Sequence, residues 1–520
     1  MKRRGANLLV ETLVRAGTRY VFAVSGNHVM SIFDAVLDSD ITLVHVRHEA
    51  AAVHMADAWA RMTGEVGVAL VTGGPGHANA VSALYTALAS QAPVILLSGH
   101  APRDELGRGA FQEMRQADLA APVTKAAWTA ERADTLGALV ASAMRLALSG
   151  TPGPVSISLP SDVLEALTIT PPPALTDLQP QPACFIDTVR PIARRLAAAQ
   201  RPVMIAGPAL ATLAGRALQR ELADTLRVPL VVMESPRGIH DPSLGRFGDV
   251  LARADAALLI GKAQDFTLRF GAVFDAGCEV HELAPDSNPY DVVRGFIAAA
   301  DGVQGAPAEW SAEVTEALQY RPASWGTAGS SAEIQRGMHP LSVCSAVQTL
   351  VDAHPEAILV SDGGEFCQWI QAAVSVPHRI INGPAGAIGP GLPFALAAKL
   401  ARPGSLVVAA IGDGTFGFHM SELDTARRYG LPIVVVVGND ARWNAEYQIQ
   451  LRAFGPARAL GCELLPTRYE QVAQALGGHG QEVSRPEDLP LALEHAVASG
   501  LPACVNVSIQ SVSAPRMTMH

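Results

Sequence analysis

Long apolar runs, paired cysteines and basic clusters are all missing from this chain of 520 residues. No stretch approaches the roughly 18 apolar residues of a membrane-spanning helix, so no association with a membrane is expected. The six cysteines are scattered without a CxxC pair, at positions 184, 278, 344, 367, 462 and 504. This scattering argues against a disulfide framework and against a structural zinc site. The net charge of −10, without a long basic cluster, argues against a nucleic-acid partner.

Aromatic residues are also scarce, at 5%, whereas hydrophobic residues make up 49% of the chain. That content is enough for several cores, and the length predicts roughly three domains. The first residues, MKRRGANLLVETLVRAG, contain no continuous apolar segment of the kind found in a signal peptide. A protein of the cytoplasm is therefore expected.

Two segments rich in proline and small residues divide the chain. They are ALTITPPPALTDLQPQPA, which ends at residue 183, and RPASWGTAGSS, at residues 321–331. Proline runs cannot continue a helix or a central strand. We predict domains at residues 1–168, 184–322 and 335–515. Each alternates helical patterns with short apolar strands, such as GVALVT at 67–72, which predicts three consecutive doubly wound α/β domains with parallel sheets.

Two acidic residues in the third region each follow an apolar strand pattern. Asp413 ends the run SLVVAAIGD and Asp440 ends LPIVVVVGND, 27 positions later (440 − 413). This spacing accommodates a helix and a strand, so both carboxylates are expected at the same edge of a parallel sheet, where such sheets bind ligands. Two carboxylates suit Mg²⁺. Gly412 and Gly414 would let the backbone approach a diphosphate closely, and Thr415 adds a hydroxyl group.

A Gly-Asp-Gly turn alone is also a common way to connect a strand to a helix. The wider set of motifs changes the weighing. The segment RHEAAAVHMADAWAR covers residues 47–61, and further motifs are Gly26-Asn27-His28, VTGGPGHANA at 71–80, Ala110-Phe111-Gln112-Glu113, APVTKAA at 121–127 and GPVSISLPSDV at 153–163. Together with the spaced Asp413 and Asp440, they resemble thiamine diphosphate-dependent enzymes of the acetolactate synthase and benzaldehyde lyase branch. The resemblance covers essentially the whole chain.

The resemblance implies a role for three residues of the first domain, which would bind the pyrimidine ring of the cofactor. Glu49 would hydrogen-bond N1′ of the ring and favour the imino form that removes the proton from the thiazolium carbon C2. His28 and Gln112 would face the reacting carbon and move protons on the substrate. Without the resemblance, Glu49 would read as an acidic residue that stabilises a helix N-terminus.

The third domain would bind the diphosphate and the metal. The resemblance implies Asp413, Asp440 and the main-chain carbonyl of Arg442 as Mg²⁺ ligands, with Asp440 standing where the family usually has a second Asn. The carbonyl of Gly386 would accept a hydrogen bond from the 4′-amino group, and Ile388 would lie beneath the cofactor and bend it. Four consecutive residues would contribute to the diphosphate pocket: Gly363, Gly364, Glu365 and Phe366.

Family members build each active site between two chains, so the resemblance implies a homodimer at minimum, and a homotetramer is expected. The central domain binds FAD or an ADP-containing group in some members. Here GRFGDV at 245–250 and IGKAQDF at 260–266 do not decide whether it binds FAD, a CoA or ADP group, or neither.

The preferred interpretation is an acetolactate synthase-like carboligase that decarboxylates a 2-oxo acid such as pyruvate and joins the fragment to a second carbonyl compound. Trp443, three residues after Asp440, is typical of the benzaldehyde lyase branch instead, and the nearby Glu446 would repel a substrate carboxylate. A lyase acting on a 2-hydroxy ketone or a 2-hydroxyacyl-CoA is therefore the alternative. A non-catalytic cofactor-binding homologue is a third hypothesis, against which Glu49, His28 and Gln112 together argue. A nicotinamide dehydrogenase is set aside because no GxGxxG follows the first strand. The donor, the acceptor and the direction of the reaction remain open.

Overall fold

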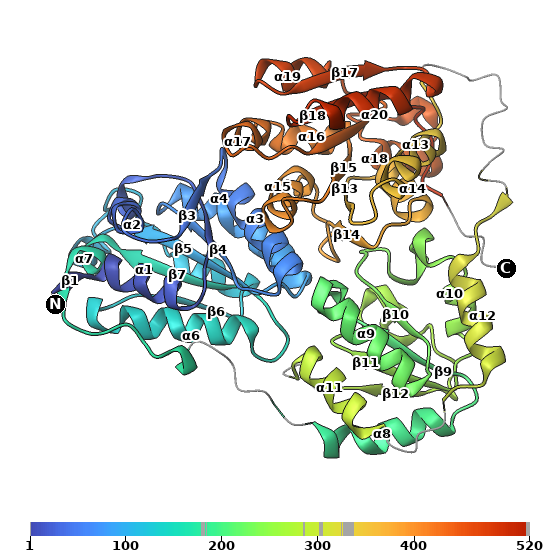
Figure 1. Cartoon of the computed structure of the whole chain (residues 1–520), viewed down its shortest axis with the longest axis horizontal. Helices are drawn as coiled ribbons and strands as arrows, with labels where there is room; N and C mark the ends of the chain where they lie inside the picture. Colours follow the sequence, from blue (N-terminus) through green and yellow to red (C-terminus); the bar gives the residue numbers. More distant parts are fainter. Residues whose placement is uncertain are drawn as a thin grey trace.

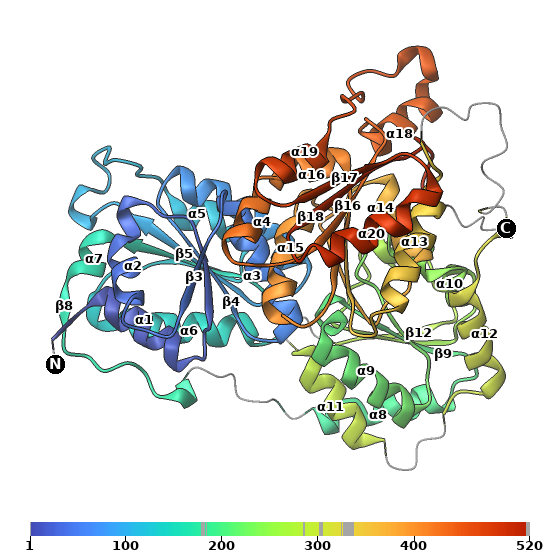
Figure 2. The ribbon, with the colours of Figure 1, turned by 45° about the horizontal axis from the view of Figure 1, so that its top comes forward.

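The computed structural model describes residues 2–177, 183, 185–283, 287–300, 305–323, 325 and 337–515. These residues form three α/β domains with parallel sheets, which confirms the predicted fold class (Figures 1 and 2). The exact domain bounds stay predictions, and the predicted starts at residues 184 and 335 lie outside the described residues. Within the described part of the chain, no helix is both long enough and apolar enough to cross a membrane.

The first domain contains a six-stranded parallel sheet in the order β3-β2-β4-β5-β7-β6. Its central strands are buried runs of Val, Leu, Ile and Ala, as expected for a parallel sheet covered by helices on both faces. The strands are β2 (Tyr20–Ala23), β3 (Thr42–His45), β4 (Gly67–Val71), β5 (Val94–His100), β6 (Ala126–Thr129) and β7 (Val155–Pro160). The helices are α1 (Gly5–Arg15), α2 (Met30–Val36), α3 (Glu49–Thr63), α4 (Pro75–Ala89), α5 (Gln116–Ala120), α6 (Leu136–Leu148) and α7 (Ser161–Glu165). A short antiparallel pair, β1 (Arg3–Arg4) with β8 (Leu167–Thr168), joins the two ends of the domain.

The central domain has a smaller parallel sheet of four strands in the order β10-β9-β11-β12. These strands are β9 (Pro202–Ala206), β10 (Leu230–Val232), β11 (Ala256–Ile260) and β12 (Glu279–Glu282). Its helices are α8 (Ile186–Ala198), α9 (Leu213–Leu226), α10 (Phe247–Leu251), α11 (Pro289–Ala299) and α12 (Ala308–Gln319).

The third domain contains a second six-stranded parallel sheet, in the order β14-β13-β15-β16-β18-β17. Its strands are β13 (Ile358–Asp362), β14 (His378–Ile381), β15 (Val407–Gly412), β16 (Val434–Asn439), β17 (His479–Val483) and β18 (Ala503–Ser508). Its helices are α13 (Pro340–Asp352), α14 (Glu365–Ala373), α15 (Gly391–Ala401), α16 (Asp413–His419), α17 (Glu422–Arg428), α18 (Asn444–Phe454), α19 (Tyr469–Ala475) and α20 (Leu489–Ala498).

The first and third sheets share one strand order. Numbered from the first strand of each sheet, both follow 2-1-3-4-6-5, although the sequence shows no internal repeat. In such a sheet the strand order reverses between strands 1 and 3, and a ligand crevice opens at the carboxyl ends of these strands. The crevices therefore lie after β2 and β4 in the first domain and after β13 and β15 in the third.

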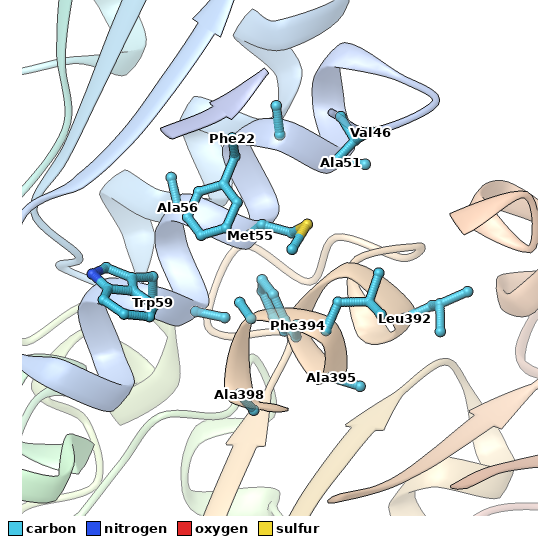
Figure 3. Packing of buried hydrophobic residues seen from close by; sticks show 14 of the residues in the cluster. Phe22, Val46, Ala51, Met55, Ala56, Trp59, Leu392, Phe394, Ala395 and Ala398 are labelled. Atoms are coloured by element: carbon cyan, nitrogen blue, oxygen red, sulfur yellow. The ribbon is translucent and has the colours of Figure 1, made fainter. Parts of the chain in front are cut away.

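One apolar core joins the first and third domains through helices α3 and α15. Figure 3 shows Phe22, Met55 and Trp59 of the first domain close to Leu392 and Phe394 of the third. Six of the 15 residues of α3 are alanines that are almost fully buried, so the two helix backbones can approach closely. Because Glu49 is the first residue of α3, this packing fixes the backbone that carries it.

Candidate active site

The third domain brings three acidic residues to the carboxyl edge of its sheet. Asp362 ends β13, Asp413 follows β15 directly, and Asp440 follows β16 directly. β15 pairs with both β13 and β16, so the three residues lie on neighbouring strands. The position predicted for Asp413 and Asp440 from their strand patterns is thus the position in the structure.

Burial changes the ionisation of the two predicted metal ligands. Asp413 is 2% exposed, and burial raises its pKa to about 6, against the opposing effect of nearby backbone N–H groups. Burial, followed by repulsion from Asp413, raises the pKa of Asp440 to about 8. Two buried carboxylates that repel each other favour a cation between them.

The surrounding polar groups fit a metal ion. One carboxylate oxygen of Asp413 is buried without a hydrogen-bond partner. The backbones of Arg442 and Glu463 form an isolated antiparallel β-bridge. Its hydrogen bonds come from the neighbouring residues: Trp443 N–H donates to the Cys462 carbonyl, and Leu464 N–H donates to the Ala441 carbonyl. The N–H and carbonyl of Arg442 therefore face away from residues 462–464, on the side where its N–H lies close to the Asp413 carboxylate. Since the described residues contain no cluster of three or more His, Cys, Asp and Glu side chains that could hold a metal, an ion here would need main-chain oxygens and ligands from outside the protein.

Glycines leave room beside the carboxylates. A Cβ atom on Gly412 would meet nothing within 4 Å, so the space beside this residue is open. Gly363 has a φ of +127° and lies against the Thr415 hydroxyl, since a Cβ atom at Gly363 would lie 3.0 Å from it. On the other side, Gly414 packs against the Trp443 ring. These residues form an open cradle next to Asp413.

The predicted run from Gly363 to Phe366 divides into two parts. Gly364 approaches Ala445, while Phe366 is buried and its ring packs against Gly438 in the core of the domain. The carboxylate of Glu365 accepts hydrogen bonds from the Gln368 side chain and from the Ala514 backbone, both at 2.9 Å. Phe366 thus belongs to the core next to the cradle, and Glu365 holds Ala514, near the end of the described chain, against α14.

The loop before α15 presents Gly386 and Ile388. Gly386 has a φ of +65°, which glycine adopts readily, and it is exposed. The side chain of Ile388 is also unusually open for a large apolar residue, at 39% exposed. Asp362, which the sequence analysis did not single out, accepts hydrogen bonds from the backbone of this loop. Its position directly after the apolar run AILVS was the signal that could have found it.

The first domain brings two of its predicted residues, His28 and Glu49, to Thr72, the residue that follows β4. The Thr72 hydroxyl lies 3.3 Å from Nδ1 of His28, and a Cβ atom on Gly76 would lie 2.8 Å from Thr72 and 3.4 Å from Glu49. Glu49 is half-buried and accepts a hydrogen bond from Asn79 at 3.0 Å. Thr72 was not predicted as a site residue, although its place at the end of the strand pattern GVALV is the same signal that identified Asp413.

His28 and Gln112 lie on two loops that face each other. The His28 ring stacks with Phe111 at 6.2 Å between ring centres. Burial and the neighbouring His100 lower the pKa of His28, so its ring is neutral near pH 7. Gln112 has a φ of +58°, and its side-chain oxygen is buried without a hydrogen-bond partner. A strained residue with an unsatisfied polar atom is typical of a ligand-binding position.

The corresponding crevice of the central domain is filled by a residue from another domain. Gly207 follows β9 and Gly261 follows β11, and a Cβ atom on Gly207 would lie only 1.9 Å from the carbonyl oxygen of Gly261. Gln91, from the end of α4, donates a hydrogen bond to the Gly261 carbonyl at 2.7 Å and accepts one from the Ala209 N–H at 3.0 Å. Its side chain therefore connects both strand ends.

Comparison with known proteins agrees with this geometry. Residues 3–119 match the family described as thiamine pyrophosphate enzyme, N-terminal TPP binding domain, and residues 362–507 match the C-terminal TPP binding domain of the same enzymes. The chain belongs to the thiamine pyrophosphate enzyme family. The two matched segments contain the two groups of predicted residues, around Thr72 and around Asp413.

Relatives extend the similarity over nearly the whole enzyme. A probable acetolactate synthase of Mycobacterium bovis is 34% identical over 98% of this chain and 96% of its own length. The human 2-hydroxyacyl-CoA lyase 2 is 32% identical over 98% of this chain and 90% of its own length. Acetolactate synthase isozyme 3 large subunit of Escherichia coli is 29% identical over 95% of this chain and 92% of its own length. The relatives thus carry names of both an acetolactate synthase and a 2-hydroxyacyl-CoA lyase.

Proposed function

We propose that this enzyme uses thiamine diphosphate and Mg²⁺ to form or cleave a carbon–carbon bond next to a carbonyl group. The observation that carries the proposal is the pair Asp413 and Asp440, with one buried, unpartnered oxygen on Asp413. In this proposal the two carboxylates and the Arg442 carbonyl hold Mg²⁺. The cofactor, when bound, supplies a nucleophilic carbon and accepts the electrons of the broken bond.

The residues of the chain would then control protons and orientation. Glu49 would hold a proton at the edge of the pyrimidine ring, with Asn79 fixing the carboxylate through its 3.0 Å hydrogen bond. The Gly386 carbonyl and the Ile388 side chain would orient the rings. His28, neutral near pH 7, can accept a proton, and the unpartnered oxygen of Gln112 can accept a hydrogen bond from substrate.

For the reaction, we propose first an acetolactate synthase-like carboligase that decarboxylates a 2-oxo acid such as pyruvate. The support is the extent of the similarity to proteins named acetolactate synthase, which covers both binding domains and the central domain.

A 2-hydroxyacyl-CoA lyase is the second candidate, and one observation favours it. A pocket of about 530 Å³ lies between the central and third domains, and Glu365 forms part of its wall. Arg237, Arg246 and Arg452 line this pocket together with two acidic residues, so positive groups are in excess. The volume suits a ligand larger than pyruvate, and the excess of positive groups suits a substrate that bears phosphates, such as a CoA thioester.

For the central domain, FAD and an ADP-containing group were both considered. We propose that neither occupies the crevice between β9 and β11, because Gln91 fills it with two hydrogen bonds. The purified protein is then expected to release no flavin on unfolding. Visible absorbance of the released material checks this, and stoichiometric flavin would contradict it.

For assembly, we propose a homodimer at minimum and a homotetramer as the working form. Large apolar side chains are exposed beside the site residues of the first domain, with Phe111 at 68%, and of the third domain, with Phe418 at 54% and Ile388 at 39%. A second copy of the chain would cover them. A cytoplasmic location is proposed because the five cysteines that the structure describes are unpaired, as in a reducing compartment.

The deciding experiment is product analysis by mass spectrometry. Purified protein with thiamine diphosphate and Mg²⁺ would be incubated with pyruvate, and separately with a 2-hydroxyacyl-CoA and with benzoin. Acetolactate from pyruvate supports the carboligase, whereas aldehyde release from the other two substrates alone supports the lyase. If no substrate is turned over and the cofactor does not bind, the proposed function is wrong.

A further inference from the structure

The loop that carries Ile388 is fixed by polar contacts rather than by packing of the Ile388 side chain. That side chain is 39% exposed, so apolar contacts hold only part of it. Its two neighbours in the chain, Ala387 and Gly389, are anchored through their backbones. The carbonyl of Ala387 accepts a hydrogen bond from the Asn382 side chain at 2.8 Å.

Gly389 is held on both of its polar groups by buried side chains. Its N–H donates to Oδ2 of Asp362 at 3.0 Å, and the same oxygen accepts the Gly391 N–H at 2.8 Å. Its carbonyl lies 2.8 Å from Nδ1 of His419, which must therefore carry the proton and donate it. Asp362 is fully buried and His419 is 6% exposed, so water does not compete for these bonds.

Gly389 is required for this arrangement. Its φ is +105°, a backbone conformation that residues with a Cβ atom rarely adopt, and a Cβ atom there would lie 2.9 Å from that of Phe418. The loop can therefore approach α16 only with glycine at this position.

Both anchoring side chains belong to the elements that form the cradle. Asp362 ends β13 and is followed by Gly363, while His419 ends α16, the helix that begins with Asp413. Burial lowers the pKa of His419 to about 4 and raises that of Asp362 to about 7. The His419 ring is thus neutral near pH 7, with its single proton on Nδ1, where it donates to the Gly389 carbonyl. The position of Ile388 is therefore fixed by β13 and α16, the same elements that lead to Gly363 and carry Asp413.

We propose that Asp362 and His419 are positioning residues, which clamp Gly389 and thereby fix Ile388 relative to Asp413 at the start of α16. This proposal rests on the proposed function, because the group that Ile388 would orient is thiamine diphosphate. The clamp itself is a property of the protein alone.

The test uses two matched pairs of variants. Asp362→Asn keeps an acceptor oxygen and Asp362→Ala removes it. His419→Asn keeps a side-chain N–H near the position of Nδ1, and His419→Leu removes it. Both substitutions at His419 lose the ring, so their difference reports the hydrogen bond. Thermal unfolding identifies any variant that fails to fold, and the remaining pair then carries the test.

The first readout needs no cofactor. Hydrogen exchange of residues 383–391, measured by mass spectrometry in the full chain, should be faster in the Ala and Leu variants than in their Asn partners. Equal protection in all variants would overturn the clamp, whatever the enzyme binds.

The second readout separates positioning from general damage. In the Ala and Leu variants we expect the dissociation constant for thiamine diphosphate with Mg²⁺ to rise about tenfold, and proton exchange at C2 of the bound cofactor to slow about 100-fold. Affinity for inorganic pyrophosphate with Mg²⁺ should change less than about twofold, because the cradle is untouched. If the affinities for thiamine diphosphate and for pyrophosphate fall together, or if proton exchange at C2 is unchanged, the proposed positioning role is wrong. Failure of the unmodified enzyme to bind thiamine diphosphate would instead contradict the proposed function, and the hydrogen-exchange result would still decide on the clamp.

Discussion

At the scale of single residues, the buried carboxylates of Asp413 and Asp440 lower the stability of the folded chain when both are ionised and no cation is bound. Their pKa values are raised to about 6 and to about 8, first by burial and, for Asp440, next by repulsion from Asp413. A carboxyl group whose pKa is higher in the folded state costs stability when it must ionise there. The metal-free chain therefore loses stability as the pH rises from about 4 to about 8, and a bound cation removes this penalty.

We predict that Mg²⁺ affinity rises with pH between about 6 and 8, because the cation must displace the retained protons. Asp440→Asn removes the carboxyl group with the higher pKa, so this variant should bind Mg²⁺ with a flatter pH dependence. Calorimetric titration in the presence of thiamine diphosphate measures both. An equally steep dependence in the variant and the unmodified enzyme would show that Asp440 is not the group that titrates.

Glu49 provides a second residue-scale prediction. Glu49→Gln keeps the size of the side chain but removes the group proposed to hold a proton, so turnover should fall about 10²- to 10⁴-fold. Cofactor affinity should change far less. Steady-state kinetics and a binding titration check the two expectations. Glu65→Gln is the matched control, since Glu65 is an exposed partner of Arg19, and its turnover should be unchanged. Unchanged turnover in Glu49→Gln would contradict the mechanism.

The sequence predicted the positions of residues that follow a recognisable local pattern. Asp413 and Asp440 end apolar runs, so their place at the edge of the sheet follows from the sequence pattern. The role of Glu49 was predicted only from the resemblance of its segment to thiamine diphosphate enzymes. Asp362 has the same signal, since it follows the apolar run AILVS, but it was not among the predicted site residues. His419 carries no local signal, because its contact with Gly389 joins residues 30 positions apart and depends on how α16 packs against the loop.

At the scale of elements, Arg61 of α3 belongs to a buried ion pair and also contacts the third domain. Nε of Arg61 lies 2.7 Å from the Asp57 carboxylate, and the same guanidinium donates to the Ser90 hydroxyl and to the Ile381 carbonyl of β14, each at 2.7 Å. The Asp57 side chain is 0% exposed and that of Arg61 is 11% exposed. One side chain thus joins α3, the end of α4 and the third domain.

We predict that Arg61→Leu destabilises the chain by about 3–5 kcal/mol, because Asp57 is left buried without its partner. The double variant Asp57→Asn with Arg61→Leu should recover part of this loss, since the unpaired charge is gone. Denaturant unfolding of the three proteins measures the difference. Arg132→Ala, which breaks an exposed ion pair with Asp134, is the control and should leave the midpoint unchanged. A loss in Arg61→Leu as small as in this control would show that the buried contacts of Arg61 do not stabilise the fold.

Strands were easier to predict than the contacts between domains. The apolar runs GVALVT and LPIVVVVGND became β4 and β16 within about three residues, since a buried parallel strand has a continuous apolar pattern. The shared strand order of the first and third sheets could not be predicted from the sequence, because it depends on which strands the connecting helices join side by side. Gln91 was equally invisible, since its partners lie in another domain.

At the scale of the whole molecule, the first and third domains each contribute one half of a proposed site. Glu49 and His28 make their side-chain hydrogen bonds inside the first domain, to Asn79 and Thr72. The residues around Asp413 form a separate half in the third domain, with exposed apolar side chains beside both halves. A symmetric dimer would let each half face its complement on the other chain.

Mixing two inactive chains tests this arrangement. Glu49→Gln damages only the first half, and Asp413→Asn damages only the second. In a mixed dimer whose sites form between chains, one site combines both damaged halves and the other combines the two intact halves. Random pairing makes half of the dimers mixed, and half of their sites are intact, so co-expression should restore about a quarter of the unmodified activity. Differently tagged chains, purified through both tags, should reach about half. If each site lay within one chain, every site would carry one damaged half, and mixing would restore nothing.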